Sequence, residues 1–157
     1  MGYTSRFLTL TKGTGVINRI FHSYGDYTGD MEGRRNGALI SMENGKAVAF
    51  AIFNLQARGE MFVTHNDPVY EGMIVGLSSK SGDLEINVMK GKKLTNMRTQ
   101  GTDENVVLTP VRKIAIAEQL SMLNTDEALE ITPKSCRLRK MVLDPHERKR
   151  QSRAKAS

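Results

Sequence analysis

Apolar and polar residues alternate along the middle of the chain in a pattern typical of β-strands. Over 84–89, three branched aliphatic residues alternate with Glu85 and Asn87, which predicts a strand with one buried face. Short apolar runs between turn-forming residues predict further strands at 61–64, 73–79, 105–109, 129–131 and 136–142. The pattern therefore indicates a mostly antiparallel, β-rich domain over 33–143.

Two turn signals predict hairpins within this domain. Asn44-Gly45 is a strong hairpin signal, because both turn positions need a positive φ. The run after it, 47–53, alternates alanine with larger apolar residues, so we expect a central strand with two buried faces. Gly82-Asp83 similarly predicts a turn that joins strand 73–79 to strand 84–89.

Apolar residues at the spacing of a helix occur outside the predicted sheet. Tyr3, Phe7 and Leu10 share one face and predict a helix over 2–11, followed by a β-branched and aromatic strand over 16–24. Four glycines among polar residues predict a linker over 25–37. A second apolar spacing, from Ile116 to Leu123, predicts a helix over 115–123.

The C-terminal end carries a good helix start. Asp144 is a suitable N-cap, Pro145 suits the first helical position, and Glu147 completes the capping pattern. The helix that follows is basic and has no apolar face, so we expect it to fray in isolation.

Composition narrows the class of protein. A length of 157 residues suits one domain, or one domain and part of another. Hydrophobic residues make up 39% and charged residues 25%, which is typical of soluble proteins. The longest apolar run, Ala47 to Phe53, is too short to cross a bilayer. The single cysteine, Cys136, permits no internal disulfide, and a reducing, cytoplasmic location with no membrane partner is expected.

Positive charge is concentrated in two places. Residues 134–157 hold nine Lys/Arg and two Asp/Glu, a net of +7, whereas 1–133 hold fourteen and fifteen, a net of −1. Within that neutral body, four cations fall in 90–98 without any acid, on a segment that has no strand period and reads as a long loop. Such features attract a polyanion. A solvated surface that only promotes solubility explains the charges equally well.

The residues predicted to contact a polyanion combine the cations of these two regions with one amide that can bond to sugar or base. They are Lys90, Lys92, Lys93, Asn96, Arg98, Arg137, Arg139, Lys140, Arg148, Lys149 and Arg150.

No motif for catalysis is present in the sequence. The P-loop pattern G-x-x-x-x-G-K-[ST] is missing, so these residues are not expected to hydrolyse a nucleotide. His65 and Asp67 lie near Glu71 but are better explained as an exposed polar turn than as a metal site. The alternation of its strand turns Cys136 inward, which predicts a structural thiol. We therefore expect no enzyme, metal, cofactor or small-molecule substrate for these residues.

Several runs of residues resemble one family closely. Asn54-Leu55-Gln56, Val69-Tyr70-Glu71-Gly72 and Gly91-Lys92-Lys93-Leu94-Thr95-Asn96 are similar to the C-terminal region of the TypA/BipA family of ribosome-binding translational GTPases, over about 36–140. Residues 2–24 resemble the last helix and strand of the preceding domain, which is like the ferredoxin-like fifth domain of elongation factor G.

The resemblance implies an α+β protein with three parts: a partial ferredoxin-like fragment and linker (1–32), a β-rich C-terminal domain (33–143) and a basic tail helix (144–157). It also implies a ribosome-binding module whose loop 91–104 and tail contact rRNA and the A-site tRNA. GTP and magnesium would belong to a GTPase domain outside these residues. The family is linked to ribosome assembly and stress adaptation. The alternative is a protein-interaction or structural domain with no direct RNA contact.

Overall fold

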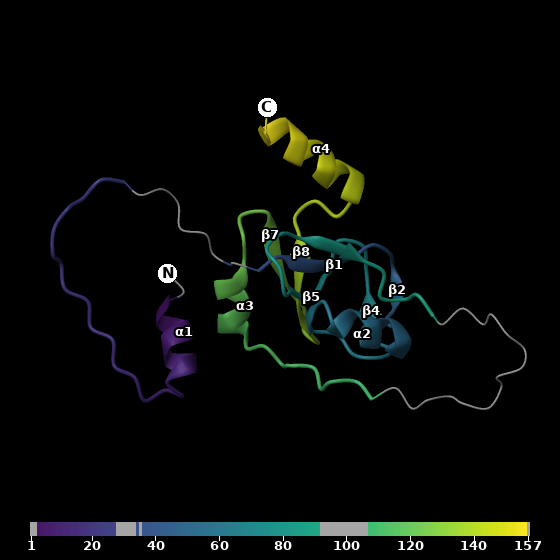
Figure 1. The fold of residues 1–157 in the computed structure, drawn as a ribbon, viewed down its shortest axis with the longest axis horizontal. Helices are drawn as coiled ribbons and strands as arrows, with labels where there is room; N and C mark the ends of the chain where they lie inside the picture. The colour runs from purple at the N-terminus through teal and green to yellow at the C-terminus, as the bar shows by residue number, and fades with distance from the viewer. Residues whose placement is uncertain (1–2, 28–33, 35, 92–106, 157) are drawn as a thin grey trace, which may run out of the picture.

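The computed structural model describes residues 3–27, 34, 36–91 and 107–156. Figure 1 shows these residues as an α+β arrangement in which short strands form a central body and helices lie around it. The elements are α1 (Tyr3–Leu10), β1 (Ala38–Ser41), β2 (Gly45–Lys46), α2 (Ala49–Gln56), β3 (Gly59–Met61), β4 (Pro68–Val69), β5 (Ile74–Ser78), β6 (Leu84–Ile86), α3 (Ile116–Met122), β7 (Glu127–Ile131), β8 (Cys136–Lys140) and α4 (Pro145–Ala156).

The main sheet has four strands in the order β3-β5-β1-β6. Its β3–β5 and β5–β1 pairs are antiparallel, as are the separate pairs β2–β4 and β7–β8, which confirms the expected α+β class. The β1–β6 pair is parallel, with Leu39 opposite Leu84. The hairpin predicted at Gly82-Asp83 is therefore wrong, because β6 pairs with β1 and not with β5.

The strand predicted over 47–53 is also wrong, because Ala49–Gln56 form α2. Alanine and leucine favour helix, and a helix can bury a wide apolar surface as readily as a central strand. Ala51 and Ile52 are buried, and the helix contacts β3. The hairpin predicted at Asn44-Gly45 does not form either, since β2 pairs with β4.

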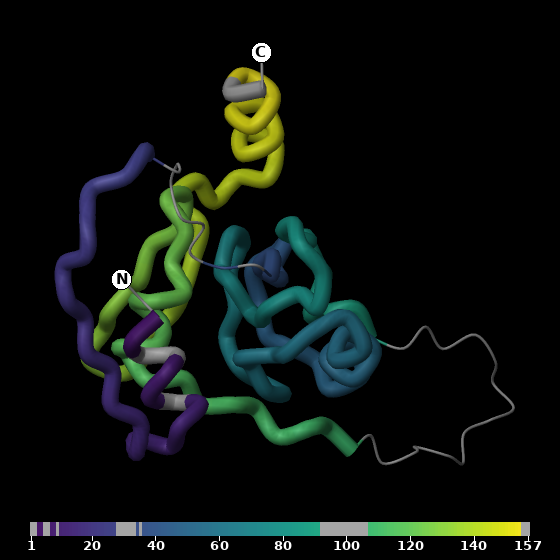
Figure 2. The backbone as a smooth tube through the Cα atoms, turned by 60° about the vertical axis from the view of Figure 1, so that its left-hand side comes forward, coloured from purple at the N-terminus to yellow at the C-terminus, as the bar shows by residue number. Residues whose placement is uncertain are grey.

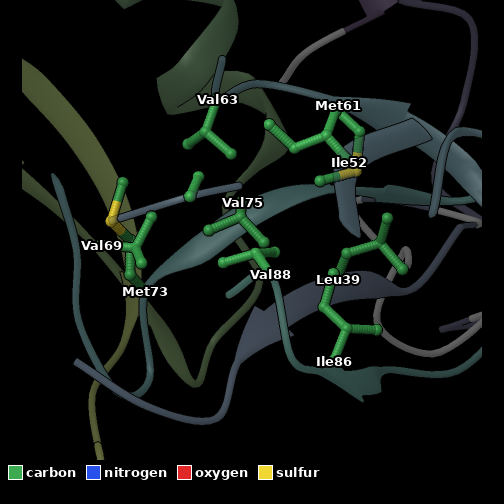
Figure 3. Packing of buried hydrophobic residues seen from close by; sticks show 10 residues of the cluster. Leu39, Ile52, Met61, Val63, Val69, Met73, Val75, Ile86 and Val88 are labelled. Carbon is green, nitrogen blue, oxygen red and sulfur yellow. The ribbon is translucent and has the colours of Figure 1, made fainter. Parts of the chain in front are cut away.

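The core fills the space between α2 and the main sheet. Leu39 and Val75 come from neighbouring strands, Ile86 from the far edge, and Ile52 from the helix, and all four are buried. Figure 3 shows these side chains gathered with Val88 into one apolar cluster. The alternation predicted over 84–89 is confirmed at its buried positions, because Ile86 and Val88 face this core.

The β7–β8 hairpin confirms the two strands predicted near the C-terminus. Glu127 lies opposite Lys140, and Ile131 lies opposite Cys136. Leu138 joins a second buried cluster with Ile40 and Ile74 of the main sheet. The hairpin is thus packed on the body rather than standing apart from it, and it leads directly into α4 (Figure 1).

The N-terminal segment confirms one prediction and contradicts another. Helix α1 forms as expected and contacts α3. Residues 16–24 are irregular, and the strand predicted there is wrong. No described strand pairs with this segment, so its backbone has no ladder to join, and Ile20 is 93% exposed. Residues 107–109 are irregular too, although a strand was predicted over 105–109.

The remaining two helix predictions are confirmed, at α3 and α4. In the part of the chain that the structure describes, no helix has the length and apolar content needed to cross a membrane.

Candidate nucleic-acid interface

Helix α4 presents part of the predicted basic surface. Its start is capped as the sequence predicts: Asp144 Oδ1 accepts hydrogen bonds from the backbone N–H of His146 (2.6 Å) and Glu147 (3.3 Å). These two bonds hold the pKa of Asp144 below its usual value. The side chains of Lys149 and Arg150 are 67% and 77% exposed, so both cations face solvent.

Arg148 has a different environment from its neighbours on α4. Its Nη1 donates to the carbonyl oxygens of Val142 (3.0 Å) and Leu143, and its Nη2 lies 3.1 Å from Glu85 Oε1 on β6. Since its side chain is mostly buried, Arg148 attaches the start of α4 to the body.

The second basic region is described only at its beginning. Lys90 is exposed, directly before the chain reaches Gly91. The predicted contacts Lys92, Lys93, Asn96 and Arg98 lie outside the described residues. Figures 1 and 2 both show α4 and the end of the described stretch that follows β6 on different sides of the body.

Arg137 and Arg139 lie on the face of β8 opposite Leu138, as the alternation predicts, and both are half-buried. Arg137 is 3.6 Å from Glu130, and Arg139 donates to the backbone oxygen of Lys140. Glu130 also accepts a 2.6 Å hydrogen bond from the Tyr70 hydroxyl. Burial and this nearby carboxylate raise the pKa of Tyr70 well above its usual value. Part of the positive charge on this face is therefore neutralised locally.

Lys140 does not belong to an accessible basic surface, and this corrects the prediction made for it. The residue is 1% exposed, and its ammonium is surrounded by the carboxylates of Asp83, Asp126 (2.8 Å) and Glu127 (3.0 Å). A polyanion cannot reach a cation that is enclosed in this way. The sequence did hold a signal, because position 140 shares the inward face of its strand with Cys136 and Leu138.

Arg34 completes this charge network, and no local sequence pattern indicated its role. Its guanidinium binds Glu127 through two bonds, Nη2 to Oε1 (2.8 Å) and Nη1 to Oε2 (3.1 Å). It also lies 3.8 Å from Asp83 and donates to the carbonyl oxygen of Met122. The network consequently connects the segment before β1 with the start of β6, the end of α3 and the β7–β8 hairpin.

The network perturbs two pKa values. Burial alone would lower the pKa of Lys140, but the three carboxylates outweigh it and raise that pKa above its usual value. Burial would likewise raise the pKa of Asp83, yet hydrogen bonds from Ala38 N–H (2.7 Å) and Lys140 lower it. Both groups are thus held in their charged forms.

The sequence also raised a metal site near His65 and a role for Cys136. No group of three histidines, cysteines or carboxylates is placed to hold a metal ion there. Asp67 accepts a hydrogen bond from Thr64 N–H, as expected of a polar turn. Cys136 is half-buried at the wall of a cleft of about 450 Å³ between β8 and 111–114, and no carboxylate lines this cleft.

Comparison with known proteins identifies the family. The model of the TypA/BipA C-terminal domain matches residues 36–145. A protein of Buchnera aphidicola subsp. Schizaphis graminum is 50% identical over 154 residues, which is 98% of this chain and 25% of that protein. An Escherichia coli protein is 48% identical over 155 residues, 98% of this chain and 26% of that protein. Both carry the name large ribosomal subunit assembly factor BipA.

The chain spans about a quarter of the length of these relatives. Its 157 residues include no P-loop and match a C-terminal domain, so the part of the protein seen here is not a GTP-hydrolysing domain. The family model matches most of the chain, and the relatives are about 50% identical to it. The chain therefore belongs to the TypA/BipA family and contains the C-terminal domain of that family.

Proposed function

We propose that this chain is a ribosome-binding module that contacts rRNA and the A-site tRNA through its two basic regions. In this proposal the cations bind phosphate and set affinity, while Asn96 bonds to a sugar or base edge. Lys140 is excluded because it is buried, and Arg148 serves as an attachment rather than a contact. The remaining candidates are Lys90, Lys92, Lys93, Asn96, Arg98, Arg137, Arg139, Lys149 and Arg150.

The observation that carries this proposal is the similarity, over nearly the whole chain, to relatives that are named large ribosomal subunit assembly factors. The structure supports it by placing Lys149 and Arg150 on the outside of a helix that leaves the body (Figure 1). Exposed cations on a body that is otherwise neutral favour an anionic partner.

Co-sedimentation with ribosomes over a series of salt concentrations tests the proposal. Phosphate contacts release counterions, so the logarithm of the affinity should fall steeply and linearly with the logarithm of salt concentration. Binding that does not change with salt, or no binding at low salt, would reject an RNA-contacting role.

A protein-interaction role is the second candidate, and the N-terminal segment favours it. Val16, Ile20, Phe21 and Tyr24 are all strongly exposed on an irregular stretch. Exposed apolar groups of this kind are typical of surfaces that meet another protein. Salt-independent binding to ribosomal proteins, retained when the basic residues are removed, would support this alternative.

In the longer protein, this module would deliver the family's activity to the ribosome. GTP and magnesium would be bound by a separate GTPase domain, and residues 1–32 would form the end of a preceding ferredoxin-like domain. Action in the cytoplasm, in ribosome assembly and stress adaptation, follows from the same proposal.

A further inference from the structure

We propose that the ion pair between Arg148 and Glu85 is a positioning device, which directs α4 so that its outer cations meet the phosphates of double-helical RNA. The inference rests on the proposed function, because it takes RNA as the partner. It identifies the residues that orient the helix and the form of RNA that the helix fits.

Helix α4 lacks the usual means of being held against a domain. Its sequence, PHERKRQSRAKA, contains no large apolar residue, so it cannot pack through a hydrophobic stripe. Figures 1 and 2 show it extending away from the body after its first turn. Its direction must therefore depend on polar contacts near its start.

Arg148 and Glu85 supply such contacts. The guanidinium bonds at once to two carbonyls of the preceding turn and to the Glu85 carboxylate, and the two side chains are only 13% and 22% exposed. Partial burial makes this pair stronger than the exposed pair between Arg150 and Glu147, which solvent screens. Since β6 belongs to the main sheet, Glu85 connects the helix to that sheet.

This attachment determines where the other cations point. Lys149, Arg150 and Arg153 follow Arg148 by one, two and five positions, and at about 3.6 residues per turn they point roughly 100°, 200° and 140° away from Arg148 around the helix. All three residues are exposed. Arg148 thus turns toward Glu85. The Nζ of Lys149 also lies 3.8 Å from Glu85 Oε2, but its side chain stays 67% exposed and forms an outer ridge with Arg150 and Arg153.

A ridge of fixed direction suits a partner whose phosphates are also fixed. Double-helical RNA is recognised mainly by shape and backbone contacts, whereas surfaces for single strands usually offer aromatic side chains on which bases stack. Helix α4 has no phenylalanine, tyrosine or tryptophan. A flexible single strand could also follow the ridge in any orientation, so positioning would matter little for it.

The test compares two variants that each remove one negative charge, Glu85→Ala and Glu43→Ala. Glu43 is exposed, and its side chain makes no hydrogen bond or ion pair with the described residues, which makes it a matched control. Affinity for a short RNA duplex is measured by fluorescence anisotropy at fixed salt concentration. Simple attraction between charges predicts that both variants bind the duplex more tightly.

A positioning role for Glu85 predicts weaker binding of the duplex by Glu85→Ala. Glu85→Ala should bind the duplex about three- to tenfold more weakly, in keeping with loss of a partly buried ion pair, while Glu43→Ala should bind at least as tightly as the unmodified chain. Arg148→Ala should be weakened too, and the double variant Glu85→Ala/Arg148→Ala should be weakened less than additively. On a single-stranded RNA, Glu85→Ala and Glu43→Ala should behave alike.

The outcomes distinguish a failure of the proposed function from a failure of the positioning role alone. If the unmodified chain binds no RNA, the proposed function fails and this inference fails with it. If it binds, but Glu85→Ala binds the duplex as tightly as Glu43→Ala, only the positioning role is overturned. The unfolding midpoint checks that the variants are folded, and Glu85→Gln, which keeps the shape of the side chain, replaces Glu85→Ala if that variant unfolds.

Discussion

Two lysines in the C-terminal part of the chain have opposite environments. Lys140, at the end of β8, is enclosed by three carboxylates in the interior, whereas Lys149, on α4, is two-thirds exposed. Both contribute to the same run of positive charge in the sequence. The comparison shows that charge density along a chain does not reveal which cations a partner can reach, because the direction of each side chain decides it.

The two environments also differ in energy. In the network, the side chains of Lys140, Glu127 and Arg34 have lost almost all of their water, so the removal of one partner leaves a poorly compensated buried charge. On the outer side of α4, water and salt screen Lys149 and Arg150, and a single ion pair there contributes little to stability. We therefore expect substitutions in the network to change folding and those on the outside of α4 to change binding.

The largest effect is expected at Lys140. Lys140→Met keeps most of the side-chain volume but leaves Glu127, which is fully buried, with one cation fewer. The free energy of unfolding should fall by about 3–5 kcal/mol, as for other buried pairs that lose one partner. Urea unfolding followed by circular dichroism measures this change.

Lys149→Met is the matched control for that substitution. It should alter stability by no more than about 0.5 kcal/mol, because its side chain is largely in solvent. Equal stability losses in the two variants would contradict the contrast between the interior network and α4.

A smaller effect is expected from pH, with Asp83 as the group responsible. Its pKa is lowered in the folded protein, so its contribution to stability is present above its unfolded pKa of about 3.9 and is lost as the pH falls through the lower, folded value. Asp83→Asn should be less stable near neutral pH, and its stability should fall less in this acidic range. Unfolding curves between neutral pH and this range measure the difference.

Glu43→Gln serves as the control for the acid experiment, since it also removes an exposed carboxylate. Its unfolding curves over the same pH range give the baseline for the loss of one carboxylate outside the network. If Asp83→Asn shows the same loss of stability toward low pH as the unmodified chain, the network is not a source of acid sensitivity.

At alkaline pH the sign reverses. The pKa of Lys140 is raised in the folded protein, so its contribution to stability is lost only as the pH rises above the usual pKa of a lysine.

The smallest stability effect is expected at the start of α4. Asp144→Ala removes the acceptor for the N–H groups of His146 and Glu147. Helix content measured by far-ultraviolet circular dichroism should decrease slightly, while the unfolding midpoint of the body should not move. A large loss of global stability would show that α4 is coupled to the core more strongly than its polar surface indicates.

Local features of the fold could be predicted from the sequence. The cap at Asp144, the spacing from Ile116 to Leu123, and the alternation on β8 each depend on residues close together in the chain, and each element formed as predicted. The family resemblance was carried by short runs of this kind as well, and the family match confirms it.

Features that depend on distant partners could not be predicted. The run 47–53 has the alternation of a strand, but most of it lies in α2, where Ile52 packs with Leu39 and Val75 of the distant main sheet. The segment 16–24 has strand composition but no described strand to pair with. The bidentate pair of Arg34 with Glu127 joins residues 93 positions apart, a distance that no local pattern encodes.

The central claim is that cations in the two basic regions bind RNA, and the segment 91–104 offers its most direct test. Ribosome co-sedimentation is measured over a salt series for the unmodified chain and for the triple variant Lys92→Ala/Lys93→Ala/Arg98→Ala. If each cation contacts one phosphate, the slope of log affinity against log salt should become shallower by about 0.7–0.9 per cation. The unfolding midpoint should stay unchanged, and affinity at low salt should drop. A triple variant that binds ribosomes like the unmodified chain at every salt concentration would contradict the claim for this segment.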